Sequence, residues 1–525
     1  MRKLALALVA AFRSAAIPPD DNMTTALSTL HAARPLLIAA AVAYYYRISA
    51  PPLSAWTRHA MDAMDAVPTV GRGGVPRAMP YSRALVEEMS SRSTTRPQPL
   101  RVAGELEELP CLKWTAEHLS VTGGEVQLSA FRQNSSEFVL ARGQEELFSR
   151  SRSVSRASVT QREFWAAADA AESGAGGMLY QFGTLAEWGE ALQAEAAEPT
   201  LEASLGVWDA PRGLAAAAQT EWPRPAANVW AAHAGVMATA HYDPSHNVVI
   251  QLQGRKRWLL WAPEELGRLR LHPATHPSRR QTRLPLVGPS ADTAAVGHAD
   301  YGATRAMSLE LGPGEMLYVP PYWAHAVLSV TPSVALSVLS PAWIAASWAA
   351  AKRTPLPFSG LAAPPRRAVA VARYLRRLLP RVAALRPHTS AAFVRRVYEA
   401  GHADVAAPVD VAGAGGADAA AAERMRAELG DAACDALTTS ADSVAGEEEE
   451  EEEAAAMGEA ALYKAATAVS ALLATEDGER RFTDGVAREL LTGYVDELAA
   501  WAVGDARKAA GLLACWTRGV EPAPL

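Results

Sequence analysis

The stretch NVWAAHAGVMATAHYDPSHNVVIQLQGRKRWLLW, from Asn228 to Trp261, carries the strongest pattern in this chain. It contains a His-x-Asp pair, His241 and Asp243, and an extended backbone would point both side chains to the same face. A second stretch, LGPGEMLYVPPYWAHAVLSV, begins at Leu311 and brings in His325 near its end. Two histidines and one carboxylate on one side of a small β-barrel are the ligands that an Fe(II) site with open coordination positions needs. The two stretches therefore predict a barrel with a ferrous centre.

Other histidines in the chain are weaker candidates for metal ligands. Two further His-x-Asp pairs, at 298–300 and 402–404, lie in a Gly/Ala-rich loop and after an Arg-rich helical segment. His272 and His276 lie in a loop that contains several prolines, where surface or loop-packing roles are favoured over metal binding. Only His241 combines strand-forming neighbours with a second histidine on a later strand.

The strand pattern of the barrel runs from Asn228 to Pro341. Residues Asn247–Gln253 and Lys256–Trp261 flank a Gly-Arg dipeptide, which predicts a β-hairpin. Met316–Val319 is expected to be a strand after a Gly-Pro-Gly turn, and Ser333–Leu339 to be the last barrel strand.

Composition and length restrict the class of protein. The 525 residues suggest about three domains, and the net charge of −7 is matched by the seven acids of Glu447–Glu453 alone. The rest of the chain is balanced in charge, which disfavours nucleic acid as a partner. Three cysteines, Cys111, Cys434 and Cys515, are far apart and argue against a disulfide framework and a zinc-binding module.

The N-terminal residues 1–50 are expected to form a targeting or anchor segment. Two basic residues precede the apolar run LALALVAAF, as in a signal peptide, and the Ala-rich composition with scattered Arg also fits an organellar presequence. A second apolar run, Pro35–Tyr46, is too short to span a bilayer unaided. Membrane association through residues 1–50 is one of the alternatives for this segment. The compartment is otherwise cytoplasm or nucleus. Residues 51–96, rich in Pro, Gly, Ser and Arg, are predicted to be a linker.

The region after the barrel is predicted to be largely helical. Residues 346–403 form a helical extension, 404–456 a low-complexity acidic linker with disorder over 404–422 and the Glu run, and 457–525 the C-terminal helices. These last helices are candidates for a homodimer interface, with packing back on the barrel as the equal alternative.

Several spaced motifs, in this order, resemble the JmjC (cupin-like) family of Fe(II)- and 2-oxoglutarate-dependent oxygenases. Within that family, the chain is most similar to the small hydroxylase branch typified by the asparaginyl hydroxylase that acts on the hypoxia-inducible factor. The likeness covers about residues 95–345. It rests on WTAEHL (114–119), TQREFW (160–165), MLYQFGTL (178–185), HYDPSHNVVIQLQGRKRWLLWAPEEL (241–266), LHPATHPSRRQ (271–281) and LGPGEMLYVPPYWAHAV (311–327).

This resemblance implies an α+β fold, with a double-stranded β-helix (jelly-roll or cupin) barrel at 228–341 inside a JmjC domain at 97–345. It implies that His241, Asp243 and His325 bind Fe(II), and that the remaining positions take 2-oxoglutarate and O2. The implied activity is hydroxylation of a protein side chain, with release of succinate and CO2, on a protein or peptide substrate.

The resemblance also assigns residues to the cosubstrate. Lys256 would pair with the distal carboxylate of 2-oxoglutarate as a point charge, and Tyr180 would donate its hydroxyl to the same carboxylate. Asn247 matches a residue near the metal and the cosubstrate. The family position three residues before the first ligand is usually Thr or Ser. Here it is Ala238, so the nearby Thr239 is the candidate.

A second departure from the family pattern is Leu339, because the family often has a polar residue at this position of the last strand. The two departures, Ala238 and Leu339, keep a second function open, that of a non-catalytic JmjC-like binding module. A lysyl demethylase and an RNA hydroxylase are further alternatives within the family. The first is disfavoured by the lack of zinc-binding readers and the second by the lack of a basic groove.

Overall fold

A computed structural model describes residues 55–65, 77–80, 98–103, 110–133, 137–138, 155–168, 177–196, 225–284, 286, 299–353, 355–382, 389–403, 414–438, 449–473 and 482–521. Every described residue belongs to one compact unit, Ser54–Leu525. The predicted targeting or anchor segment 1–50 lies outside the described residues. Within the described part of the chain, no helix combines the length and the apolar character needed to cross a bilayer.

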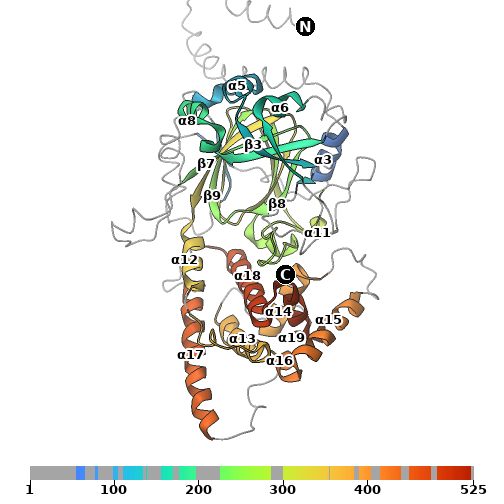
Figure 1. The fold of residues 1–525 in the computed structure, drawn as a ribbon, viewed down its shortest axis with the longest axis vertical. Coiled ribbons are helices and arrows are strands. Elements are labelled where there is room, and N and C mark those ends of the chain that lie inside the picture. Colours follow the sequence, from blue (N-terminus) through green and yellow to red (C-terminus); the bar gives the residue numbers. More distant parts are fainter. Residues whose placement is uncertain are drawn as a thin grey trace, which may run out of the picture. The chain divides into compact units, whose positions relative to one another are not determined.

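Two sheets form the barrel (Figure 1). Over the described residues, the larger sheet has the order β1-β2-β12-β9-β14-β7-β6-β3-β5 and the smaller sheet the order β11-β10-β13-β8-β4. The larger sheet consists of β1 (Arg77–Pro80), β2 (Leu100–Ala103), β3 (Gln127–Gln133), β5 (Ser155–Thr160), β6 (Met178–Thr184), β7 (Ala226–Ala232), β9 (Ser245–Gln253), β12 (Met316–Val319) and β14 (Ser333–Pro341). The smaller sheet consists of β4 (Glu137–Phe138), β8 (Met237–Tyr242), β10 (Lys256–Trp261), β11 (Ala306–Leu311) and β13 (Ala324–Ser329). The expected α+β fold with a cupin-like barrel is confirmed.

The barrel interior is a small apolar cluster shared by both sheets. Val249 and Leu317 reach it from the larger sheet, and Trp258, Leu260 and Leu309 from the smaller one. Alternate residues of each strand face this interior, as the two-residue period of a strand requires. The outer face of the larger sheet is covered by α5 (Ala116–Thr122), α6 (Gln161–Ala166) and α8 (Glu190–Ala196), whose apolar side chains share one core with it.

The predicted hairpin between β9 and β10 is wrong, although both strands form where expected. β9 pairs with β12 and β14, whereas β10 pairs with β11 and β13, so the Gly-Arg turn carries the chain from one sheet to the other. Gly254 has φ 69°, and a Cβ there would lie 2.1 Å from the carbonyl oxygen of Pro332. The turn is therefore a tight corner of the barrel that needs glycine.

The predicted linker 51–96 contains two ordered elements, and the prediction is wrong for these. Helix α3 (Ala55–Asp65) buries Ala60 and Met64 against the smaller sheet, and Asp65 forms an ion pair with Arg257. Strand β1 adds a parallel edge to β2. Two buried side chains at a spacing of four are too short a pattern to recognise among the surrounding Pro and Gly residues.

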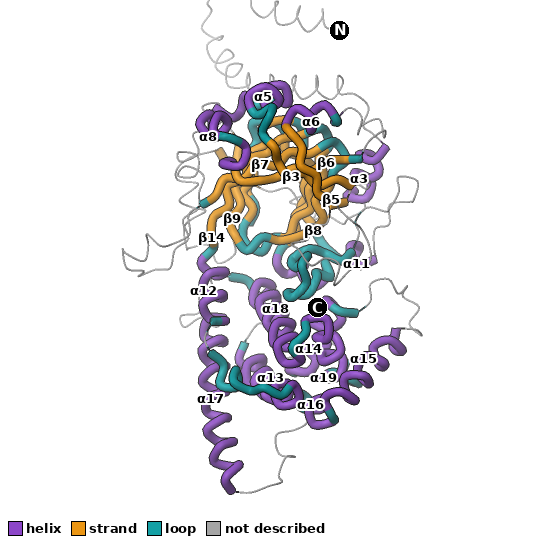
Figure 2. The backbone as a smooth tube through the Cα atoms, in the orientation of Figure 1, coloured by secondary structure: helices purple, strands orange, loops and turns teal. Residues whose placement is uncertain are grey.

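The C-terminal helices pack together and against the outer face of the smaller sheet (Figure 2). They are α12 (Trp343–Lys352), α13 (Pro364–Leu378), α14 (Ser390–Gly401), α15 (Ala414–Leu429), α16 (Asp431–Asp435), α17 (Glu449–Leu473), α18 (Asp484–Val503) and α19 (Ala509–Trp516). The expected disorder is wrong where α15 and α17 begin, because Ala and Glu are strong helix formers. Helix α18 contacts the barrel directly, and homodimerisation through these helices remains a prediction.

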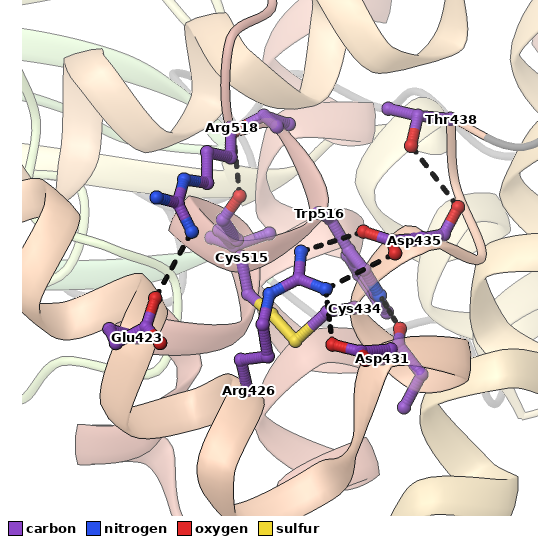
Figure 3. Close-up of a disulfide and its surroundings, with 12 residues drawn as sticks. Glu423, Arg426, Asp431, Cys434, Asp435, Thr438, Cys515, Trp516 and Arg518 are labelled. Carbon is purple, nitrogen blue, oxygen red and sulfur yellow. Dashed lines mark hydrogen bonds and ion pairs between the residues drawn. A yellow bond between two sulfur atoms is a disulfide. The ribbon is translucent and has the colours of Figure 1, made fainter.

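A disulfide joins two of these helices, which the sequence argued against. Cys434 of α16 and Cys515 of α19 are bonded with their Cα atoms 5.2 Å apart, across 81 residues of sequence (Figure 3). The indole Nε1 of Trp516 donates to the carbonyl of Ala433 at 2.9 Å beside it. Only the packing of α16 on α19 brings the two thiols together, so their spacing in the sequence could not predict the bond. Cys111 is buried in the other core as a free thiol.

Candidate metal centre

Three predicted ligands converge at one end of the barrel. His241, near the end of β8, lies directly opposite His325 of β13, and their ring centroids are 4.3 Å apart. Asp243 follows β8, and its Oδ2 is 3.9 Å from Nε2 of His325. One potential ligand atom of each residue lies within 4.8 Å of the others. This is the only cluster of three or more such groups in the described part of the chain that could hold a metal ion.

Backbone carbonyls orient both imidazole rings. Nδ1 of His241 is 2.7 Å from the carbonyl oxygen of Thr239, and Nδ1 of His325 is 3.1 Å from that of Trp323. A carbonyl can only accept, so each Nδ1 carries the proton and each Nε2 presents its lone pair. Burial, and then the neighbouring His241, lower the pKa of His325 to about 4, against the opposing charge of Asp243. The neutral, metal-binding form of the imidazole is thus favoured.

A β-bulge in β8 decides which neighbour faces the interior. His241 pairs with His325 and Ala238 with Val327, so Thr239 and Ala240 together oppose Ala326. Ala240 and Ala326 belong to the outer core, on the side of the C-terminal helices. The register therefore places Ala238 on the interior face, and the contact between Thr239 and the cosubstrate stays a prediction.

Lys256 lies inside the barrel, at the start of β10. It is 4% exposed and shares a strand face with Trp258 and Leu260, which line the interior. Burial lowers the pKa of its ammonium to about 7, and no opposite charge offsets this effect. Among the described residues, Lys256 forms no ion pair. A buried cation without a counter-ion is unstable unless an anion binds beside it.

Tyr180 and Asn247, which the resemblance assigned to the cosubstrate and the metal's surroundings, are also buried. Burial raises the pKa of the Tyr180 phenol well above its usual value, and the charge of Asp243 raises it further, so this phenol lies near the metal ligands. Its ring stacks on Trp230 with centroids 6.0 Å apart. Asn247 of β9 lies between Val319 of β12 and Leu339 of β14, the position where the family pattern usually has a polar residue. Its Oδ1 is buried without a hydrogen-bond partner.

Sequence reasoning missed three residues beside the carboxylate ligand. Nη1 of Arg280 lies 3.9 Å from Oδ1 of Asp243, and the backbone N–H of Tyr322 donates to the Asp243 carbonyl at 2.8 Å. Gln281 forms an isolated bridge with His241. Arg280 and Tyr322 have φ of 69° and 64°, a strained conformation for a residue with a side chain. Arg280 and Gln281 end the motif LHPATHPSRRQ, and Tyr322 lies in the motif LGPGEMLYVPPYWAHAV, but no local pattern in either motif placed these residues at the metal.

The other candidate histidines lie elsewhere and have structural partners. His272 and His276 stack with centroids 4.2 Å apart, and burial lowers the pKa of His276 to about 4. Nε2 of His402 is 2.7 Å from Oδ1 of the buried Asp496. The preference for loop packing over metal binding is consistent with these contacts. The pair at 298–300 lies partly outside the described residues.

Comparisons with known proteins show what the sequence around this site is similar to. The family model described as a cupin-like domain matches residues 86–340. Jumonji C domain-containing protein 5 of Drosophila melanogaster is 33% identical over 111 residues, which are 21% of this chain and 26% of that protein.

Two further relatives show the same range of likeness. Lysine-specific demethylase JMJ30 of Arabidopsis thaliana is 34% identical over 115 residues, 21% of this chain and 24% of that protein. The HSPB1-associated protein 1 homolog of Danio rerio is 38% identical over 98 residues, 19% of this chain and 20% of that protein. The matched segments thus span about a quarter or less of these curated relatives. Residues 86–340 are thus similar to a cupin-like domain, and part of the chain is similar to a Jumonji C domain-containing protein.

Proposed function

We propose that this protein is an Fe(II)- and 2-oxoglutarate-dependent dioxygenase that hydroxylates a protein side chain. One observation carries the proposal: the barrel holds a two-histidine, one-carboxylate cluster and, on the same interior, a buried ammonium with no counter-ion. A metal site alone would need only the cluster. The unpaired Lys256 adds a requirement for an anion.

His241, Asp243 and His325 would hold the metal. The carboxylate and two neutral imidazoles reduce a divalent charge to about +1, which favours an anionic cosubstrate. The carbonyls of Thr239 and Trp323 keep both Nε2 atoms available. The geometry fits a ferrous ion with open positions. When bound, iron and 2-oxoglutarate supply the oxidising power for C–H hydroxylation, with release of succinate and CO2.

Lys256 would hold the far carboxylate of 2-oxoglutarate. Pairing with a carboxylate favours the charged ammonium, so cosubstrate binding should raise the pKa of Lys256 from its depressed value. Tyr180 would add a hydroxyl donor at the same place. The amide of Asn247, whose Oδ1 has no partner, is available to a ligand near the metal. The apolar interior around Trp258 and Leu309 excludes water from this end of the barrel.

The support for a protein substrate comes from the names of the relatives. One is named for its association with HSPB1 and others for lysine demethylation, and those names describe those proteins. Demethylation of lysine and hydroxylation of RNA remain alternatives of the same chemistry. Measuring formaldehyde released from methyl-lysine peptides would distinguish the first alternative.

A non-catalytic binding module is the second candidate, and one observation favours it. The interior position beside His241 is Ala238, which has no hydroxyl for the cosubstrate, and Leu339 is apolar next to Asn247. Such a module would bind metal without binding 2-oxoglutarate.

The test is succinate production by the purified full chain with Fe(II), 2-oxoglutarate and ascorbate. The wild type should release succinate even without a protein substrate, at a slow uncoupled rate. His241→Ala should abolish the release, whereas the matched control His118→Ala, on α5 and hydrogen-bonded to Glu195, should keep it. Metal binding by the wild type without any succinate would overturn the proposal and favour the non-catalytic module.

A further inference from the structure

The residue between two of the metal ligands faces away from the metal. Tyr242 follows His241 and precedes Asp243, and successive side chains of an extended chain point to opposite sides. Tyr242 is 8% exposed and belongs to the core that the outer face of the smaller sheet shares with the C-terminal helices. A group that holds Tyr242 in place therefore also holds the backbone that carries His241 and Asp243.

Glu489 of α18 holds this tyrosine from the helical region. The Tyr242 hydroxyl donates to Oε1 of Glu489 at 2.9 Å, between residues 247 positions apart in the sequence. The Tyr242 ring also stacks on Tyr322, with centroids 5.3 Å apart, and the backbone N–H of Tyr322 donates to the Asp243 carbonyl. Glu489 and the two tyrosines thus form a continuous set of contacts that ends at a metal ligand.

One face of α18 fixes the position of Glu489. Gly485 and Asp496 lie four residues before it and seven residues after it, so the three share a helix face. A Cβ on Gly485 would lie 2.4 Å from the carbonyl carbon of Pro263, just after β10, so this close approach needs glycine. Asp496 accepts from the backbone N–H of Ala274 at 3.2 Å. Because α18 is held against the barrel loops on both sides of Glu489, its carboxylate has a fixed place relative to the barrel.

The packing beside this contact is incomplete. A cavity of about 550 Å³ is lined by Tyr242, Tyr322 and Glu489, among others. Atoms that border an empty space lack packing partners on that side. The hydrogen bond to Glu489 therefore supplies a large share of the restraint on the Tyr242 side chain, and its loss leaves the ring room to move.

We propose that Glu489 is a positioning residue of the metal centre, which acts through the Tyr242 hydroxyl. It fixes the short segment that carries the ligands His241 and Asp243, so that both face His325 in the geometry that binds the metal. The C-terminal helical region thereby sets the metal affinity of the barrel. This inference rests on the proposed function, because it takes these three ligands to be the metal site.

The experiment is a Co(II) titration of the metal-free full chain, in which visible absorption reports both the affinity and the geometry of the bound ion. Tyr242→Phe and Glu489→Leu each remove one partner of the hydrogen bond. Each should weaken Co(II) binding about tenfold, as is typical of groups that orient metal ligands, and should shift the Co(II) absorption bands.

Two further variants test whether the hydrogen bond itself is responsible. Glu489→Gln keeps an oxygen that can accept from the hydroxyl, so it should retain the affinity and the spectrum of the wild type. The double variant Tyr242→Phe/Glu489→Leu should bind Co(II) about as weakly as either single variant, because both substitutions remove the same contact.

Glu497→Leu is the matched control. Glu497 lies on the same helix and lines the same cavity, but its carboxylate pairs with Lys352 of α12 at 2.8 Å. Its removal should leave the Co(II) affinity and spectrum unchanged, whatever it does to the free energy of unfolding measured in urea. A merely structural role of Glu489 would give the same result as this control.

Three results would overturn the inference: an unchanged Co(II) affinity and spectrum in Tyr242→Phe and Glu489→Leu, a Glu489→Gln variant as weak as Glu489→Leu, or the same changes in Glu497→Leu. If Glu489→Leu does not fold, Tyr242→Phe must show the weakened binding by itself, because it keeps the ring that stacks on Tyr322. A wild type that binds no Co(II) would remove the metal centre, and with it both the proposed function and this inference. The two failures are therefore distinguishable.

Discussion

Charged side chains are buried in both the barrel interior and the C-terminal helical region, but the two regions differ in whether an opposite charge lies beside them. In the helical region the buried Asp496 is paired with His402, and the partly buried Lys352 is paired with Glu497. In the barrel Lys256 has no opposite charge among the described residues, and the Oδ1 of Asn247 has no partner. Unpaired buried polar groups cost stability, so their presence in an otherwise apolar interior marks a place kept for ligands.

Removing a metal ligand should have the largest effect, a loss of metal binding, and should leave the folding of the chain unchanged. Asp243→Ala deletes the only carboxylate of the cluster, so binding of Mn(II), used as a stand-in for Fe(II), should fall below detection in equilibrium dialysis. The fold should persist, because Asp243 is partly exposed near the barrel end. Retained stoichiometric Mn(II) binding would mean that the cluster is not the metal site.

Opening the disulfide should destabilise the helical region. The bond links cysteines 81 residues apart in sequence and so closes a long loop. Cys434→Ser should therefore lower the free energy of unfolding by about 4 kcal/mol, chiefly because the unfolded chain gains conformational entropy when the loop is opened. Urea unfolding of the oxidised protein measures this, and reduction of the wild type should reproduce the loss. Equal stability of the oxidised and reduced wild type would show that the bond contributes nothing.

Breaking a buried pair should cost slightly less. Asp496, which is 2% exposed, accepts from His402 and from the backbone N–H of Ala274. Asp496→Ala should therefore destabilise the protein by about 3 kcal/mol in urea unfolding. The control Asp431→Ala breaks a surface pair with Arg426 and should cost less than about 1 kcal/mol. Similar losses for both variants would contradict the difference between buried and exposed pairs.

Removing the unpaired lysine should have the smallest effect and the opposite sign. Lys256→Met should raise the free energy of unfolding at pH 7 by about 2 kcal/mol, because a buried charge is replaced by an apolar side chain. The depressed pKa of Lys256 means that the unfolded chain binds more protons between about pH 7 and pH 10.5, so wild-type stability should rise with pH in that window. The gain from Lys256→Met should therefore shrink at pH 9.5. A variant less stable than the wild type at both pH values would refute the idea of an uncompensated charge.

The positions of site residues that lie close in sequence, on strands with a clear two-residue period, could be predicted. The positions that depend on packing between distant segments could not. The spacing of His241 and Asp243 put both side chains on one face of a strand, and the resemblance to a family assigned Lys256 to the barrel; they lie on β8, just after it and on β10. The bulge that turns Ala238 inward is invisible in the pattern, because it depends on the register with β13.

The remaining differences have the same origin. The corner at Gly254 was read as a hairpin, because both connections use the same two-residue signal and only the partners of each strand differ. The disulfide and the contact between Arg280 and Asp243 each join segments that are distant in sequence. Nothing local to either segment encodes them.

The most direct test of the ligand-ready interior is calorimetric titration of 2-oxoglutarate into Mn(II)-loaded protein. The wild type should bind one equivalent, and Lys256→Met should weaken this binding at least a hundredfold while its affinity for Mn(II) stays the same. If the wild type shows no 2-oxoglutarate binding, or if Lys256→Met binds it equally well, the buried ammonium is not there for the cosubstrate.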